Sequence, residues 1–188
     1  MLDWQPELEL SDGSVVLRPY RRDDVNELFE AARESIADLY PWLPWCHPGY
    51  QKSESEEWIS QQRDLWTQDR AYEFAVVDPV SGGYLGGCGV NSISRSHRFA
   101  NLGYWIRSSA SGRGMATAAA RLAARFGFDY LDLQRLELVI EPENAASIRV
   151  AEKLGSRREG LLHNRLNVEN DQRDALMFSL LAGDWEAG

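Results

Sequence analysis

Apolar residues recur at helical spacing in four parts of the chain. Residues 115–126 carry them at positions i, i+3, i+4, i+7, i+8 and i+11, which is typical of an amphipathic helix. A shorter run of the same kind follows Asp23, whose side chain is a good N-cap. Residues 53–66 open with the capping-box pattern S-x-x-E at Ser53. Residues 144–155 begin with asparagine and end with glycine, so they predict a fourth, short helix.

Seven other segments have the alternation or the β-branched and aromatic content of strands. Three of them, near the middle of the chain, are joined by short polar turns and predict an antiparallel meander. The later strands alternate with the two C-terminal helices. The predicted strands comprise residues 15–19, 72–77, 84–93, 99–106, 136–140, 157–162 and 175–181. This order predicts an α+β fold with a mixed, mostly antiparallel sheet flanked by helices.

Length and charge limit the classes of function. The chain has 188 residues without a linker or repeat, so we expect a single domain over residues 1–188 with a full core. Twenty-nine acidic and twenty basic residues give a formal net charge of −9. This charge repels phosphate backbones, so it disfavours nucleic acid as a general partner and favours a cationic one.

Cysteines and termini give expectations about the compartment. Cys46 and Cys88 are too few for a disulfide framework and lack the spacing of a metal site. Residues 1–6 lack the basic and apolar regions of a signal peptide. No segment approaches the roughly 20 apolar residues that span a bilayer. We therefore expect a soluble, cytoplasmic protein with neither a metal nor a membrane partner.

The segment Tyr-Pro-Trp-Leu-Pro-Trp at residues 40–45 contains two prolines, which exclude a regular helix. Its three aromatic side chains fit either a plug of the core or the wall of a ligand groove, and both interpretations stay open. The helices on either side carry Glu30, Glu34, Glu54 and Glu57. Beside a groove, these acids would attract an ammonium group or a basic peptide end.

The strongest candidate site is the small-residue loop at residues 108–114, directly before the helix at 115–126. Gly112 and Gly114 permit tight turns that expose backbone N–H groups, and the helix adds its unpaired amides and positive dipole end. Such a loop is suited to a phosphate or pyrophosphate. It matches neither the P-loop nor the three-glycine dinucleotide pattern, and G-x-G alone also fits an ordinary turn.

Three segments in order resemble the GNAT superfamily of N-acetyltransferases. The pyrophosphate loop of that family reads Q/R-x-x-G-x-G/A, and residues 111–116 read Ser-Gly-Arg-Gly-Met-Ala, with serine at the first position. Leu-Gly-Tyr-Trp-Ile at 102–106 and the N-x-x-S-x-x-V-x-x-x-x-G region within 136–155 resemble its RimJ/RimL-like branch, which acetylates protein N-termini and small amines. The resemblance extends over residues 15–181.

The resemblance implies an N-acetyltransferase that uses acetyl-CoA. Acetyl-CoA would bind where the strands 99–106 and 136–140 splay apart, and its pantetheine would hydrogen-bond to the main chain of Trp105, Ile106 and Arg107 as an added strand does. A backbone N–H near Ile106 would polarise the thioester carbonyl for direct attack by a neutral amine. The amides that would hold the pyrophosphate belong to Gly112, Arg113, Gly114, Met115, Ala116 and Thr117.

Asn144 and Ser147 are three residues apart at a helix N-terminus, so their side chains face the same side. By resemblance, Asn144 holds the cofactor, and Ser147 lies near its sulfur as the proton donor to the departing thiolate. Asparagine and serine are also ordinary capping residues, so the capping interpretation stays open.

The general base is not evident from the sequence. Asn101 stands where many relatives have a glutamate, and an amide does not accept a proton as a base must. Glu141, His97, Glu159 or a chain of water molecules are the alternatives.

Among acceptors we expect a protein N-terminus of the ribosomal-protein type first, and a small amine or amino-sugar antibiotic second. The resemblance also allows a homodimer. Two other classes of function compete with the transferase. One is a non-catalytic acetyl-CoA-binding domain, favoured by the missing glutamate. The other is a hydrolase with Cys88 as nucleophile, disfavoured because no G-x-S-x-G turn is present.

Overall fold

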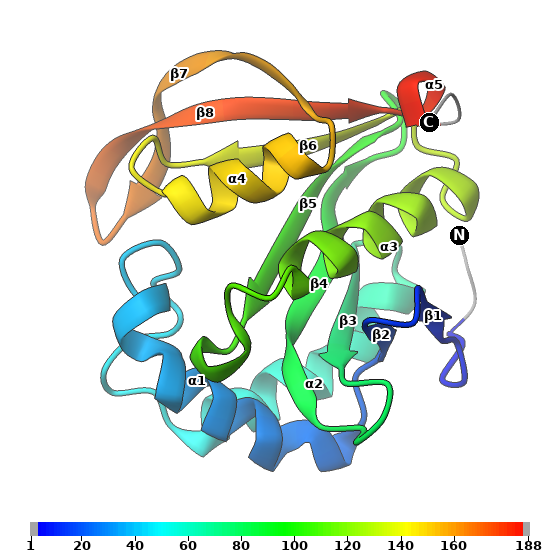
Figure 1. Ribbon diagram of the computed structural model, residues 1–188, viewed down its shortest axis with the longest axis vertical. Coiled ribbons are helices and arrows are strands. Elements are labelled where there is room, and N and C mark those ends of the chain that lie inside the picture. Colours follow the sequence, from blue (N-terminus) through cyan, green and yellow to red (C-terminus); the bar gives the residue numbers. More distant parts are fainter. Residues whose placement is uncertain (1–3, 186–188) are drawn as a thin grey trace.

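The computed structural model describes residues 4–185 and confirms the α+β fold with a mixed, mostly antiparallel sheet (Figure 1). Within these residues the strands lie in the order β1-β2-β3-β4-β5-β6-β8-β7, and only β5 and β6 are parallel. The strands are β1 (Leu10–Ser11), β2 (Val16–Pro19), β3 (Ala71–Val77), β4 (Tyr84–Ser94), β5 (Phe99–Ile106), β6 (Arg135–Ile140), β7 (Arg157–Val168) and β8 (Asp171–Leu181). The helices are α1 (Val25–Leu39), α2 (Lys52–Thr67), α3 (Met115–Asp129), α4 (Ala145–Lys153) and α5 (Ala182–Trp185).

Most predicted elements agree with the structure to within a few residues at each end, and β1 and α5 were not predicted. The capping box predicted at Ser53 is wrong. Gln51 is the N-cap of α2, and its backbone N–H donates to Glu54 Oε2 at 2.7 Å. The helix begins earlier because Tyr50 is buried and its hydroxyl bonds to Ser55, which places Ser55 inside the first turns.

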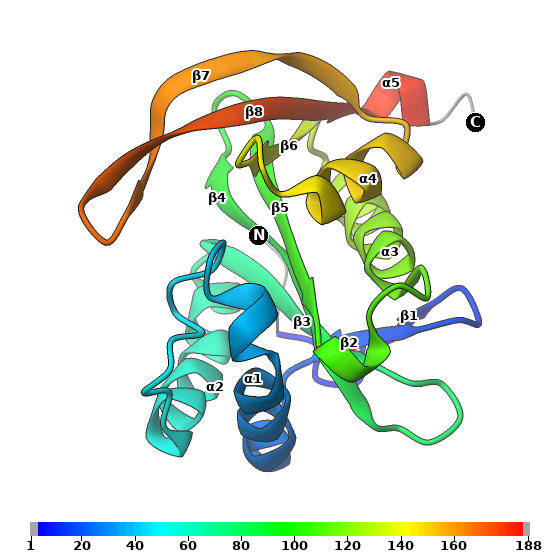
Figure 2. The ribbon, with the colours of Figure 1, turned by 60° about the vertical axis from the view of Figure 1, so that its left-hand side comes forward.

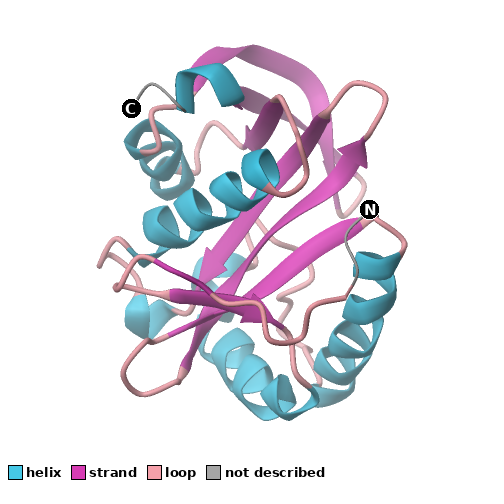
Figure 3. Cartoon of the chain, turned by 90° about the vertical axis from the view of Figure 1, so that its right-hand side faces the viewer, coloured by secondary structure: helices cyan, strands magenta, loops and turns pink. Residues whose placement is uncertain are grey.

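Helices cover both faces of the sheet: α1 and α2 lie on one face, and α3 and α4 lie on the other (Figures 2 and 3). Successive side chains of β3 point to opposite faces of the sheet, so apolar residues of this strand pack against helices on both faces. Phe74 points toward α3, where its ring lies 5.1 Å from that of Phe126. Its neighbour Ala75 packs instead with Leu28 of α1 and Ile59 of α2. Among residues 4–185, no helix has the length and apolar character needed to cross a membrane.

A buried ion pair holds the start of α1 against the sheet. Arg18 of β2 donates from Nη1 and Nη2 to the two carboxylate oxygens of Asp24, at 2.8 and 2.7 Å. Both side chains are buried, and Asp24 also accepts the backbone N–H of Arg21. The fork geometry satisfies both charges, which makes such a pair costly to break from one side.

The predicted splay between the two central strands is present. β5 pairs with β6 only at Phe99, Ala100 and Asn101, which oppose residues 135–137. Beyond Asn101, β5 stays paired with β4 as far as Ile106, while β6 pairs with β8 along its whole length. The sheet therefore divides at its centre, and the exposed edge of β5 faces the opening.

Candidate active site

A cavity of about 950 Å³ occupies the splay and is lined from both faces of the sheet. β5 and β6 supply its sides, the N-terminal ends of α3 and α4 lie on one face, and the end of α1 lies on the other. The loop at 111–117 and the helix turn at Ser147, predicted as separate parts of one site, both line this cavity.

The free edge of β5 directs a backbone N–H into the opening. Arg107 N donates to Leu85 O at 2.8 Å, toward β4. Successive N–H groups of a strand point to opposite edges, so the N–H of Ile106 points toward the splay. Gly86 opposes Ile106 and makes this close approach possible, because a Cβ there would lie 2.1 Å from the carbonyl oxygen of Trp105.

The loop before α3 has the backbone geometry expected of an anion site. Gly112 and Gly114 have φ angles of +75° and +84°, a left-handed conformation that favours glycine. An added Cβ at either position would meet nothing within 4 Å, so the loop surface is open. The amides of the first turn of α3 have no earlier carbonyl to bond, and they carry the positive end of the helix dipole. These features fit the diphosphate of a CoA molecule.

α4 presents Ser147 to the same cavity. Asn144 Oδ1 accepts the backbone N–H of Ser147 at 3.0 Å, so Asn144 does cap the helix. The hydroxyl of Tyr104, on β5, donates to the backbone oxygen of Ser147 at 3.2 Å and ties the strand to the helix. Among the hydrogen bonds of residues 4–185, none involves Ser147 Oγ, which leaves this hydroxyl available to a ligand.

Two residues predicted to bind the cofactor lie outside the lining of the cavity. The guanidinium of Arg107 pairs with Glu34 of α1, and its backbone N–H and C=O are bonded within the protein. Its arginine side chain therefore anchors the end of β5 to α1. The guanidinium of Arg113 donates to Ser109 O at 3.1 Å on the exposed side of the loop. Only its backbone N–H belongs to the anion-binding turn.

The structure shows which of the residues proposed as general base lie at the cavity. His97 is exposed in a turn, stacked on Phe99, and Glu159 is paired with Arg135, which lowers the pKa of Glu159 to about 2. Neither lines the cavity. Glu141 does line it, and it is only 7% exposed, with Arg173 Nη1 3.1 Å from its Oε2. Of these carboxylate and imidazole candidates, only Glu141 reaches the site.

The acids predicted to attract an amine are not in the cavity. Glu34 is held by Arg107, Glu54 is held by His47 and the N-terminus of α2, and the exposed Glu30 and Glu57 lie outside the lining. The sequence suggested them because they share helices with the groove segment, but the side chains turn to other faces of those helices. The carboxylates that do line the cavity are Asp38, Glu137 and Glu141.

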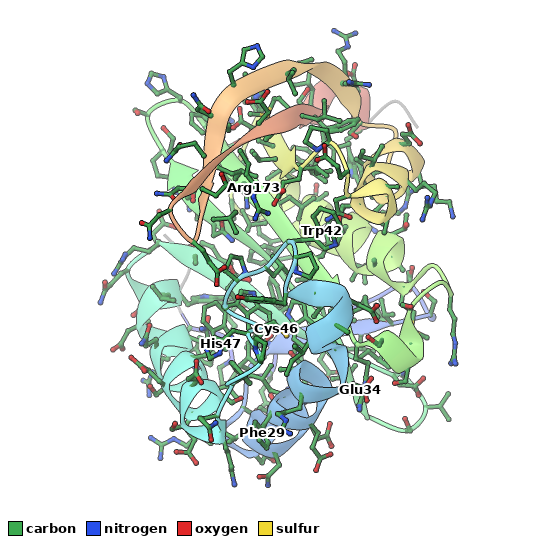
Figure 4. The ribbon with its side chains drawn as sticks, turned by 90° about the vertical axis from the view of Figure 1, so that its left-hand side faces the viewer. Phe29, Glu34, Trp42, Cys46, His47 and Arg173 are labelled. Carbon is green, nitrogen blue, oxygen red and sulfur yellow. The ribbon has the colours of Figure 1, made fainter. Side chains whose placement is uncertain are left out.

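For the segment at 40–45 the structure favours the groove wall over the core plug. Trp45 packs on Trp105, with ring centroids 5.3 Å apart, but it is 38% exposed. Trp42 lines the cavity, beneath the hairpin of β7 and β8 that carries Arg173 (Figure 4). Arg173 Nη1 donates to Pro41 O at 3.2 Å, and Tyr40 donates to Glu169, so the hairpin and the segment meet at the mouth of the cavity.

The two cysteines take no part in this site. Cys46 and Cys88 are buried and free, and burial raises the pKa of both thiols. Neither lines the cavity, so a cysteine nucleophile has no support. Within residues 4–185, no cluster of three or more His, Cys, Asp or Glu side chains could hold a metal ion.

Comparisons with known proteins agree with this geometry. The family model described as an acetyltransferase (GNAT) domain matches residues 14–157. The chain belongs to the GNAT family. The match includes both the strand–loop–helix unit with the anion site and the helix that carries Ser147.

Relatives in this GNAT family include curated proteins and solved structures. The putative ribosomal N-acetyltransferase YdaF of Bacillus subtilis is 27% identical over 92% of this chain and 93% of its own. The spermidine N(1)-acetyltransferase of Escherichia coli K12 is 29% identical over 90% of this chain and 87% of its own. A putative ribosomal-protein-serine acetyltransferase from Vibrio cholerae has a TM-score of 0.83 at 29% identity, with 95% and 99% of the two chains covered.

A second structural neighbour bears on the ligand. Mycobacterium smegmatis RimJ, solved in complex with CoA-disulfide, has a TM-score of 0.83 at 28% identity and covers 94% of this chain and 86% of its own. The GNAT family and these relatives identify the present chain as an acetyl-CoA-dependent N-acetyltransferase.

Proposed function

We propose that this enzyme transfers the acetyl group of acetyl-CoA to the primary amine of a protein N-terminus, of the ribosomal-protein type. The observation that carries the proposal is a single cavity with an anion site on one face of the sheet and an opening toward α1 on the other. This arrangement allows both substrates to be bound together, so the amine can attack the thioester directly without an acyl-enzyme.

Most of the predicted residues have a role in this proposal. The main chain of Ile106 binds the pantetheine, and its N–H polarises the thioester carbonyl. The main chain of Trp105 faces β4, as that of Arg107 does, so only its side chain lines the cavity. The amides from Gly112 to Thr117 hold the pyrophosphate. Asn144 fixes the first turn of α4, and Ser147 Oγ gives its proton to the CoA sulfur as the C–S bond breaks. The proton lost by the amine leaves to Glu141 or to water.

Two hypotheses about the acceptor are supported, a peptide N-terminus and a small amine. The resemblance to ribosomal-protein acetyltransferases supports a peptide N-terminus, and the spermidine acetyltransferase relative supports a small polyamine. The carboxylates Asp38, Glu137 and Glu141 in the cavity suit either cation. A cytoplasmic location and a homodimer stay predictions.

The first experiment is thermal melting with acetyl-CoA, and with ATP and NAD as controls. At 100 times Kd, a ligand stabilises a protein by about 2.7 kcal/mol, which is roughly 5–10 °C for a chain of this size. A shift with acetyl-CoA alone supports the site. An equal shift with ATP or NAD, or no shift, contradicts it.

The second experiment identifies the acceptor by mass spectrometry. The enzyme is incubated with acetyl-CoA and with peptides that carry a free N-terminus and one internal lysine, or with spermidine or an amino sugar. Acetylation at the peptide N-terminus supports the proposal, and the same peptide with a blocked N-terminus controls for reaction at lysine. Transfer to spermidine or the amino sugar alone would select the small-amine hypothesis. Binding of acetyl-CoA without transfer to any amine would select the non-catalytic one.

A further inference from the structure

A partly buried carboxylate without a cation lies on the face of the sheet that α1 and α2 cover. Glu73 of β3 lies across Gly89 of β4, where a Cβ would be 2.1 Å from Glu73 Oε2. Among residues 4–185 it forms no ion pair, and the hydrogen bond it accepts comes from Asn91. Burial raises the pKa of Glu73, and this hydrogen bond opposes the rise. An unpaired carboxylate is costly to bury, so its position needs an explanation.

Two amides connect this carboxylate to the active-site cavity. Asn91 of β4 donates from Nδ2 to Glu73 Oε1 at 2.9 Å. Asn101 of β5 donates from Nδ2 to Asn91 Oδ1 at 3.1 Å. Asn101 lines the cavity, whereas Glu73 and Asn91 lie behind it. Gly103, two residues along β5, lies beside the same amides: an added Cβ there would be in ordinary contact with both amide nitrogens, at 3.8 Å.

The charge of Glu73 determines which way both amides face. An ionised carboxylate only accepts hydrogen bonds, so Asn91 must turn its NH₂ toward Glu73 and its carbonyl toward Asn101. Asn101 must then give its NH₂ to Asn91, which leaves its own carbonyl oxygen for the cavity. Within residues 4–185, no donor to Asn101 Oδ1 is present. Because aligned hydrogen bonds polarise one another, this oxygen is a stronger acceptor than that of an isolated amide.

We propose that Glu73 is a positioning residue for the acceptor: through Asn91 and Asn101 it presents a carbonyl oxygen that accepts an N–H of a cationic group of the acceptor. This inference rests on the proposed function and specifies how that site recognises its acceptor. No proton passes along the amides. The two amides hold a cationic group of the acceptor and not the attacking nitrogen, because Asn101 lies roughly 16 Å along β5 from Ile106. The negative charge behind Asn101 favours substrates that arrive as cations.

The first test compares Glu73→Gln with the unaltered enzyme, with the acceptor amine that the enzyme acetylates. Glutamine keeps the size and one acceptor oxygen but also donates, so it no longer forces one orientation on Asn91. We expect kcat/KM for the amine to fall about tenfold or more, as for loss of a charge-assisted contact, with the Kd of acetyl-CoA unchanged. An unaltered kcat/KM in a folded variant overturns the inference.

Two further variants separate positioning from a general loss of stability. Glu27→Gln is the matched control, because Glu27 also bonds to β4, accepting the backbone N–H of Tyr84 at 2.8 Å, but does not line the cavity. It should stay folded at the assay temperature, as Glu73→Gln should, and keep its kcat/KM. Asn101→Ala should lose as much activity as Glu73→Gln, and the double variant should be no worse than either. Additive losses would show that the two residues act independently, which contradicts the chain.

A measurement without an acceptor distinguishes failure of this inference from failure of the proposed function. In ¹⁵N-labelled protein, the side-chain amide signals of Asn101 are assigned from their absence in Asn101→Ala. The signals should shift or double in Glu73→Gln, because Asn91 gains a second orientation, and they should stay in place in Glu27→Gln. Unchanged signals overturn the chain. Shifted signals in an enzyme that acetylates no amine would refute the proposed function alone.

Discussion

Substitution of Gly86 by alanine tests the geometry of the β5 edge more directly than any change of a polar side chain. The new Cβ would lie 2.1 Å from the carbonyl oxygen of Trp105 and 2.9 Å from Cα of Ile106, both backbone atoms. Ordinary contact begins at 3.4 Å, so the backbone of β5 must retreat by about 1.3 Å. Overpacking of this kind costs roughly 1–3 kcal/mol, and rigid backbone on both sides places Gly86→Ala near the upper limit.

Two measurements follow from that displacement. The Tm should fall by roughly 6–12 °C, from about 3 kcal/mol at 2–4 °C each. The turnover of acetyl-CoA should fall about 100-fold in enzyme that is still folded at the assay temperature, because a 1 Å misplacement of a catalytic group has that effect. Gly160→Ala in β7 is the control, since a Cβ there meets nothing within 4 Å. Wild-type turnover in Gly86→Ala would refute the assignment of the thioester to the Ile106 N–H.

Three other substitutions have definite expected outcomes. Ser147→Ala should lower kcat with little change in acetyl-CoA affinity measured by titration, and unchanged turnover would remove its role as proton donor. Glu34→Gln should reduce the dependence of stability on pH: Arg107 lowers the pKa of Glu34 from 4.5 to about 2, so the ion pair contributes fully above pH 4.5 and is lost as the pH falls toward 2. Urea unfolding at pH 7 and pH 3 should show a smaller difference than in the wild type. Arg18→Ala should cost roughly 3–5 kcal/mol in the same assay at pH 7, because it leaves the buried Asp24 carboxylate unpaired. A loss below 1 kcal/mol would contradict that account.

Local patterns in the sequence predict the fold well because each depends on near neighbours. The spacing of apolar residues identifies α3, since one face of that helix must be buried whatever lies opposite. The glycines at 112 and 114 indicate a turn from local residue type alone, because glycine accepts a left-handed backbone, and both residues have positive φ. The capping-box prediction for α2 is wrong because Ser53 and Gln51 compete for one role, and the contact of the buried Tyr50 with Ser55 decides between them.

The active site is less predictable because its composition depends on how strands pair. Tyr104 appears in the sequence as one aromatic of a strand, and its bond to the backbone of Ser147 needs the positions of β5 and α4. The connection of Glu73 to Asn101 passes through three strands, and its ends are 28 positions apart in the sequence. The ion pair of Arg107 with Glu34 likewise joins distant segments, so an arginine beside the cavity is no evidence of a ligand contact.

The opening between β5 and β6 acts as a window through the sheet. Because only three residue pairs join β5 to β6, the opening connects the two faces of the sheet through the centre of the protein and not around its edge. The nucleotide part of acetyl-CoA on the α3 side and the bulk of the acceptor on the α1 side therefore need not occupy the same space. Only the acetyl group and the attacking nitrogen must meet in the aperture, so the shape of the window, more than the size of either substrate, sets what can react.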